Sequence, residues 1–129
     1  MTTVHLRNYR QAPRKVRLLA GLVRGKGVDK ARSLLAFSGK RAWLPIDKLL
    51  QSAVAAAKEN GVSSNTKELY IEKMTVDKGF TYKRMRPRAF GRGAPIHKET
   101  SHISLTLAKT SPTKKETPRR ETEVGAEKK

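Results

Sequence analysis

The basic segment TYKRMRPRAFGRGAPIHK, residues 81–98, limits most strongly what this chain can fold into. Its large apolar side chains are only Tyr82, Met85, Phe90 and Ile96, and it contains no acidic residue. Burying its cations would cost more solvation free energy than so few apolar groups return, so the segment cannot form a core of its own. It needs structure on both sides and a polyanion around it. Its cations are Lys83, Arg84, Arg86, Arg88, Arg92 and Lys98.

The sequences on either side of this segment indicate two strands. Both flanks are rich in β-branched and large apolar residues, and the second one alternates strictly through Ile103, Leu105 and Leu107. We therefore predict one long β-hairpin over about residues 68–109, rooted in a sheet, with a basic tip at about residues 83–95.

Glycine and proline placement is consistent with a turn at residues 90–94. We expect Gly91 and Gly93 to supply positive φ, because glycine adopts that conformation at no steric cost. Pro87 and Pro95 remove backbone donors on either side, which suits an edge strand better than a sheet centre.

Composition favours nucleic acid as the partner. The chain has 29 Lys and Arg against 11 Asp and Glu, a formal charge of +18 and a pI near 10.8.

No apolar run approaches the roughly 18 residues that span a bilayer, and the first residues lack the apolar core of a signal peptide, so we expect no membrane partner and a cytoplasmic protein. Cysteine is absent and three scattered histidines make no metal site, so we expect no metal, no cofactor and no small-molecule substrate.

A second cationic region covers residues 1–27, again without an acidic residue. Pro13 suits the first position of a helix, since its fixed φ fits a helix start and its missing N–H would be unpaired there. In the helix that follows, Val16, Leu19 and Val23 recur on one face and arginines recur on another. We expect the first face to pack inward and the second to bind phosphate. The cations of this region are Arg7, Arg10, Arg14, Lys15, Arg17, Arg24 and Lys26.

The remaining elements complete an α+β fold. Residues 3–9 alternate as a half-buried strand, and residues 28–37 and about 41–60 carry apolar stripes typical of helices. Pro45 either starts the third helix or bends its first turn. The imperfect alternation of the first hairpin arm predicts a bulge near Lys73. We thus predict three helices packed on a three-stranded antiparallel sheet with a long protruding β-hairpin.

The chain is predicted to be a single RNA-binding domain, residues 1–109, with a tail. Residues 110–129 have almost no apolar side chain and mixed charge, so they cannot bury enough surface to offset the entropy of ordering. We therefore expect a disordered tail.

Three local features have less specific interpretations. GLVRGKG, residues 21–27, resembles a phosphate-binding loop, but its glycine spacing and the residue after its lysine do not fit the Walker pattern. His102 lacks a nucleophile or an acid placed by a recognisable motif, so we expect a structural or RNA-contacting role. Trp43 either stacks on a base or, as we favour, covers the end of the core.

These features favour RNA over DNA and binding over catalysis. The sequence shows no helix-turn-helix, zinc module or basic zipper, and a finger too long for one groove suits a folded RNA recognised through phosphates and 2′-hydroxyls. The low aromatic content argues against binding mainly by base stacking. The leading hypothesis is a structural RNA-binding protein; the alternative is a free nucleic-acid chaperone or nucleoid-type protein. A membrane-active basic protein is disfavoured, because the apolar stripes belong to a packed domain.

Three sequence blocks, in order, resemble large-subunit ribosomal protein twenty-two. They are APRKVRLLAGLVRGKGVDKA, SAVAAAKEN and KRMRPRAFGRGAPIHKETSHISL, and the resemblance spans about residues 4–107. RPRAFGR followed by TSHI is its most specific part, and the compact length resembles bacterial members. The sequence departs from the family pattern at Phe90, Ala94, Pro95 and Glu99.

The resemblance implies a non-enzymatic constituent of the large ribosomal subunit, in the cytoplasm, that binds large-subunit rRNA and supports assembly. It also implies that the hairpin lines the nascent-peptide exit tunnel, near ribosomal protein four and the passing nascent peptide. By matched position, the rRNA contacts of the body would come from Arg14, Lys15, Arg17, Arg24 and Lys26; the other cations of the two basic regions are expected to bind rRNA because of their charge. The tunnel-facing segment would be Arg86, Pro87, Arg88, Ala89, Phe90, Gly91, Arg92 and Gly93.

Overall fold

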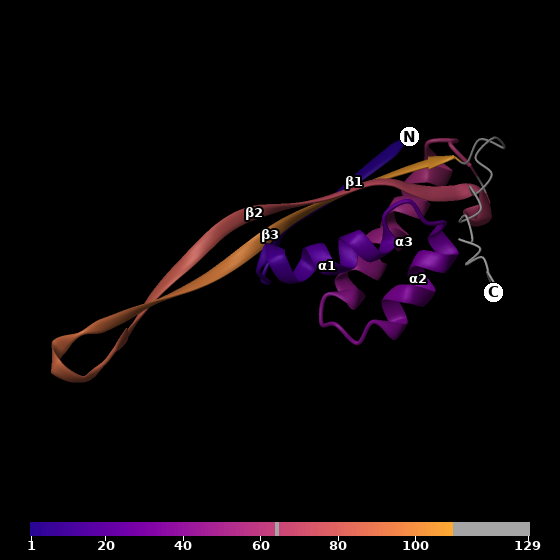
Figure 1. Ribbon diagram of the computed structural model, residues 1–129. Coiled ribbons are helices and arrows are strands. Elements are labelled where there is room, and N and C mark those ends of the chain that lie inside the picture. The colour runs from indigo at the N-terminus through magenta and orange to yellow at the C-terminus, as the bar shows by residue number, and fades with distance from the viewer. Residues whose placement is uncertain (64, 110–129) are drawn as a thin grey trace, which may run out of the picture.

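The computed structural model describes residues 1–63 and 65–109, and it confirms the predicted α+β fold (Figure 1). The tail predicted for residues 110–129 lies outside the described residues. The strands form one antiparallel sheet in the order β1-β3-β2, so the return arm of the hairpin is the central strand. The elements are β1 (Thr2–Tyr9), α1 (Pro13–Val23), α2 (Val28–Phe37), α3 (Trp43–Glu59), a 3₁₀ turn (Thr66–Glu68), β2 (Leu69–Pro87), a second 3₁₀ turn (Ala89–Gly91) and β3 (Gly93–Lys109).

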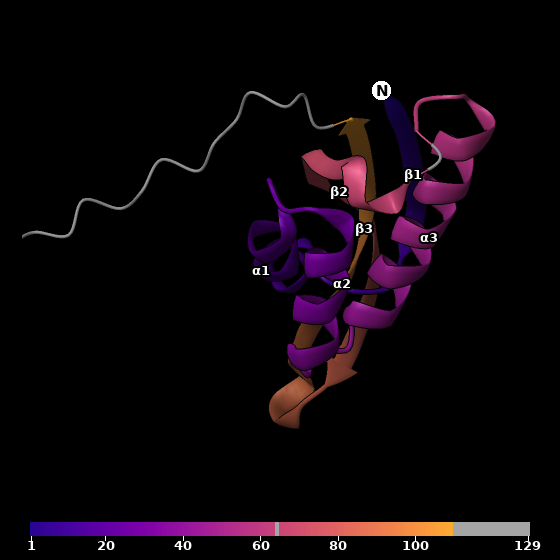
Figure 2. The ribbon, with the colours of Figure 1, turned by 90° about the vertical axis from the view of Figure 1, so that its right-hand side faces the viewer.

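The three helices cover one face of the sheet and leave the other face open (Figure 2). The core lies between these two layers, at the wide end of the molecule. Strands β2 and β3 continue beyond it as a two-stranded arm with no helix beside it (Figure 1). Large side chains that are fully buried in the core include Leu35, Ile46, Leu50, Ile71, Met74, Ile103, Leu105 and Leu107.

Proline and glycine set the helix ends much as the sequence indicates. Pro13 is the first residue of α1. Helix α3 begins at Trp43, slightly later than predicted, and Pro45 lies within its first turn. The N–H groups of the first turn have no partner inside the helix, so the missing N–H of proline costs no helical hydrogen bond there. The helix ends at Glu59, and Gly61 follows with φ +66°, the left-handed conformation that commonly closes helices.

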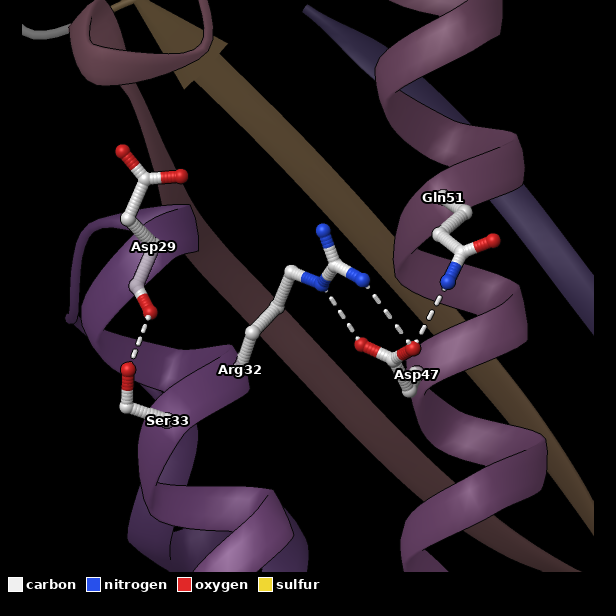
Figure 3. Close-up of polar contacts among 5 residues, drawn as sticks. All are labelled: Asp29, Arg32, Ser33, Asp47 and Gln51. Carbon is white, nitrogen blue, oxygen red and sulfur yellow. Dashed lines mark hydrogen bonds and ion pairs between the residues drawn. The ribbon is translucent and has the colours of Figure 1, made fainter.

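Helices α2 and α3 are joined by a two-pronged ion pair (Figure 3). Arg32 donates from Nε to Asp47 Oδ1 at 2.7 Å and from Nη2 to Oδ2 at 3.3 Å. Gln51, one turn along α3, donates to the same carboxylate at 2.7 Å. The hydrogen bond and the charge of Asp47 both raise the pKa of Arg32. The pair therefore adds a polar contact between two helices whose packing depends on the buried core residues.

The predicted bulge in β2 is confirmed. The pairing with β3 shifts between Ile71 and Lys73. The extra residue lets Ile71 and Met74, which lie on opposite parities, both turn into the core, where each is fully buried.

The free edge of β2 is closed by the connection between α1 and α2. Gly25 N–H donates to the Ile71 carbonyl and Ile71 N–H donates to the Lys26 carbonyl, both at 2.9 Å. Gly25 has φ +75°, which allows the chain to turn away from α1 directly onto the strand. Exposed strand edges are sites of unwanted pairing, so this connection protects the edge of β2 at the body of the molecule.

Candidate nucleic-acid interface

The hairpin is paired almost to its end. Strand β2 pairs with β3 in continuous register from Thr81, opposite Glu99, to Pro87, opposite Gly93. Seven strand residues at about 3.3 Å each make an arm of roughly 23 Å. Most residues of the predicted tip, 83–95, therefore belong to the paired strands.

The turn itself consists of Arg88 to Arg92, and two of its residues have positive φ. These are Phe90, with φ 58°, and Gly91, with φ 66°. The prediction that Gly93 supplies positive φ was wrong, since Gly93 is an ordinary strand residue. A side chain at Gly93 would instead meet Met85, because an added Cβ would lie 2.8 Å from the Met85 sulfur.

The hairpin cations are exposed and lie on more than one side of the arm. Successive strand residues point to opposite faces, so Arg84 and Arg86 share a face with Lys98, the partner of Tyr82, while Lys83 lies on the other. Arg88 and Arg92 are the first and last residues of the turn and help to line an open hollow there. Among the described residues, the ion pair closest to the arm is at its base, where Lys78 Nζ lies 2.9 Å from Glu99 Oε1.

The basic face of α1 is only partly free for a ligand. Arg17 Nε donates to the Val76 carbonyl at 3.1 Å, and Arg24 Nη2 donates to the Met74 carbonyl at 2.6 Å. Both carbonyls belong to the free edge of β2. These two arginines therefore cover more of the edge that residues 25–27 already protect by hydrogen bonding. One donor of each of these two arginines is thus already used inside the protein, and the other donors remain for the predicted phosphate contacts.

Other cations of the first basic region lie on the surface. Arg14 and Lys15 are exposed near the start of α1, and Arg7 is exposed on β1. Lys26 is half-buried, and its backbone carbonyl accepts a hydrogen bond from the N–H of Ile71 in β2. Arg10 follows β1, and its guanidinium carbon lies 5.6 Å from the centre of the Tyr82 ring. The structure thus brings the two basic regions together at the root of the hairpin.

Residues at this root, which we call the hairpin neck, were missed as a group by sequence reasoning. The neck consists of residues 7–10 of the β1 end, 78–82 of β2 and 98–102 of β3. It contains Phe80 and Tyr82, two exposed aromatic residues two positions apart. The spacing of these aromatics next to Gly79 is visible in the sequence, but only the structure shows Arg10 beside them.

Two of the three histidines make hydrogen bonds within the sheet, and the third is exposed. His5 Nδ1 lies 2.9 Å from Ser104 Oγ, and His102 Nδ1 accepts the Asn8 N–H at 3.1 Å. His97 is exposed on the arm. In the part of the chain that the structure describes, no three acidic, histidine or cysteine side chains are grouped as a metal site requires. In the same part, no helix has the length and apolar character needed to cross a membrane.

Taken together, the geometry defines a class of protein: a small packed body that carries a long, basic, unsupported β-arm. The family described as ribosomal protein L22p/L17e matches residues 4–108. Relatives named large ribosomal subunit protein uL22 include one from Myxococcus xanthus, 42% identical over 108 residues, covering 83% of this chain and 95% of that protein. One from Geobacter sulfurreducens is 46% identical over 99 residues, covering 77% and 88% respectively. One from Aster yellows witches'-broom phytoplasma is 44% identical over 115 residues, covering 89% and 87%.

The chain therefore belongs to the ribosomal protein L22p/L17e family, as a structural and non-enzymatic constituent of the large ribosomal subunit. Its location follows from the family and is the cytoplasmic ribosome of bacteria.

Proposed function

We propose that residues 1–109 act as one rRNA-binding domain with two contact surfaces. The first is the hairpin arm, with Lys83, Arg84, Arg86, Arg88, Arg92 and Lys98. The second is the basic side of the body, with Arg7, Arg10, Arg14, Lys15, Arg17, Arg24 and Lys26. On this second surface, Arg17 and Arg24 each use one N–H donor in a hydrogen bond to β2 and contact RNA with their other N–H donors. The remaining cations contact phosphates directly.

The observation that supports this proposal most strongly is that the arm is paired along its backbone but has no buried side chains. Its backbone is fully paired from Thr81 to Pro87, yet no residue from Tyr82 to Gly93 is buried. An isolated two-stranded ribbon is marginally stable in water, and like charges along it destabilise it further. A surrounding polyanion supplies the missing stabilisation, and the arm then places the rRNA contacts far from the body.

We further propose that the tip, Arg86 to Gly93, lines the nascent-peptide exit tunnel. Its neighbours there would be ribosomal protein four and the passing nascent peptide. This part is supported by the resemblance of RPRAFGR to the family's tunnel segment and by the shape of the arm. Phe90, which is 98% exposed at the end of the arm, is the side chain best placed to meet the peptide.

The test is incorporation of the protein into large subunits in cells, measured by sedimentation through a high-salt gradient. Salt weakens contacts that depend only on phosphate charge, because each contact releases counterions. We expect the full chain to remain with the large subunit. Release of the full chain to the top of the gradient would contradict rRNA binding within the subunit and favour a chaperone or nucleoid role.

A matched pair of variants separates the two surfaces. In the first, residues 85–95 are replaced by Asn-Gly, a two-residue turn that closes the pair formed by Arg84 and Ile96. In the second, Lys30→Glu reverses an exposed charge on α2, away from the arm. We expect the shortened arm to reduce incorporation and Lys30→Glu to leave it unchanged. Equal incorporation of both would show that the arm is not needed for binding.

A further inference from the structure

The hairpin neck carries an exposed aromatic cluster on a rigid base. Phe80 is 65% exposed and Tyr82 is 42% exposed. Their ring centres are 5.0 Å apart with an angle of 81° between the planes, an edge-to-face pair. The Arg10 guanidinium lies over the Tyr82 ring at 5.6 Å, within the range of a cation–π contact. Single exposed apolar residues are common, but two adjacent rings capped by an arginine form a surface of defined shape.

Two bulges, one on each side of β3, hold this cluster in place. In β2 the register shifts between Lys78 and Thr81, so that Gly79 and Phe80 together oppose Thr100. Thr100 Oγ1 donates to the Phe80 carbonyl at 2.7 Å, which fixes the backbone that carries the ring. An added Cβ on Gly79 would lie 2.6 Å from that hydroxyl, so a residue with a side chain does not fit there without a shift.

The second bulge is in β1, where the register shifts between Leu6 and Tyr9. Asn8 has φ 56° and donates its N–H to His102 Nδ1 at 3.1 Å. Because Nδ1 accepts a hydrogen bond, the neutral ring carries its proton on Nε2, which makes no hydrogen bond to the described residues and lies close to Gly79. An open hollow of about 480 Å³ lies here, on the uncovered face of the sheet, lined by His5, Arg7, Asn8, His102, Ile103 and Ser104.

The charges around the neck favour an anionic ligand. Arg7 and Arg10 are exposed, and the carboxylate of Glu99 is neutralised by Lys78. Just outside the neck, the acidic residue Asp77 lies across the strand pair from His102.

From this geometry we propose that the neck holds one unpaired nucleotide of the large-subunit rRNA. The base stacks on the exposed face of Phe80, with Tyr82 and Arg10 beside it, and the sugar and phosphate lie toward Arg7 and His102. Unpaired bases in RNA are commonly stacked on aromatic rings and guanidinium planes. The proposal rests on the proposed rRNA binding and deepens it, because it adds one base-stacking contact to a surface otherwise built on phosphate contacts.

The experiment compares Phe80→Ala with Phe80→Trp, each in the full chain, bound to a full-length transcript of bacterial large-subunit rRNA. The control is Phe37→Ala, which removes another exposed ring, 91% exposed at the end of α2. Affinity is measured by filter binding, and base accessibility by chemical probing at nucleotide resolution. Thermal unfolding is measured alongside, and Phe80→Ala is expected to change it little because the ring is largely exposed.

We expect Phe80→Ala to weaken binding about tenfold, within the range for loss of one stacked base, and to expose one unpaired nucleotide that the unmodified chain protects. Phe80→Trp should retain both affinity and protection, and Phe37→Ala should match the unmodified chain. The proposal is overturned if Phe80→Ala behaves like Phe37→Ala in both assays, or if Phe80→Trp is as defective as Phe80→Ala. Failure of the unmodified chain to prefer this transcript over unrelated RNA would instead overturn the proposed rRNA binding itself.

Discussion

Arginines 17 and 24 are predicted to stabilise the folded body even without RNA. Each donates a charged hydrogen bond to a carbonyl on the free edge of β2, at 3.1 Å for Arg17 and 2.6 Å for Arg24. Replacing both by methionine keeps much of the apolar stem but leaves the Val76 and Met74 carbonyls without these donors. The edge then depends on water or on residues 25–27 alone.

The magnitude follows from the type of contact. A hydrogen bond to a charged group contributes about 1.5–3 kcal/mol when well buried, and these partly exposed ones belong at or below the lower end, about 1 kcal/mol each. The double variant should therefore lose about 2 kcal/mol. For a domain of this size that corresponds to a fall in Tm of roughly 10 °C.

The assay is thermal unfolding followed by circular dichroism, with urea unfolding as a second measure. Arg14→Met is the control, because Arg14 is an exposed residue of the same helix and makes no hydrogen bond or ion pair to the described residues. Each variant loses one cation from the same helix, so the control also carries the relief of self-repulsion that follows from losing a charge. An Arg14→Met variant as destabilised as Arg17→Met or Arg24→Met would refute the reasoning, as would an unchanged double variant.

Two further perturbations test the neck and the far end of the sheet. Gly79→Ala should cost about 1–3 kcal/mol, read as a lower urea midpoint, because its Cβ would lie 2.6 Å from the Thr100 hydroxyl; an unchanged midpoint would contradict the tight bulge. Glu68 has its pKa lowered by a hydrogen bond from Ser63 and by Lys109, so its stabilisation is full above the unfolded pKa of about 4.3 and is lost as pH falls through the lower folded pKa. Glu68→Gln should therefore reduce Tm at pH 7 and reduce it progressively less as the pH is lowered, and a loss that does not change with pH would exclude this role.

The fold followed from the sequence where local chemistry and tertiary packing agree. Pro13 fixed the start of α1, and the strict alternation of Ile103, Leu105 and Leu107 identified the strand that proved to be central. The mixed parity of the first arm gave the bulge before Lys73. These features depend on neighbouring residues, so no knowledge of distant contacts was needed.

The candidate interface was less predictable, because its details depend on residues that meet only in the folded chain. Arg17 lies far in sequence from Val76, and helical spacing alone could not show that its guanidinium turns toward a strand edge. The turn was misplaced because glycine was taken as the sole source of positive φ, whereas Phe90 adopts it in the structure. Arg10 and Tyr82 are brought together by the sheet order, which no local pattern records.

The most direct test of the account is photo-crosslinking from the end of the arm in translating ribosomes. A photoreactive phenylalanine analogue is placed at Phe90 and, as the control, at Phe37, both of which are almost fully exposed. The account predicts a crosslink from position 90 to the nascent peptide and none from position 37. Large subunits that contain the position-90 protein but give no crosslink to the nascent peptide would contradict the tunnel placement of the arm.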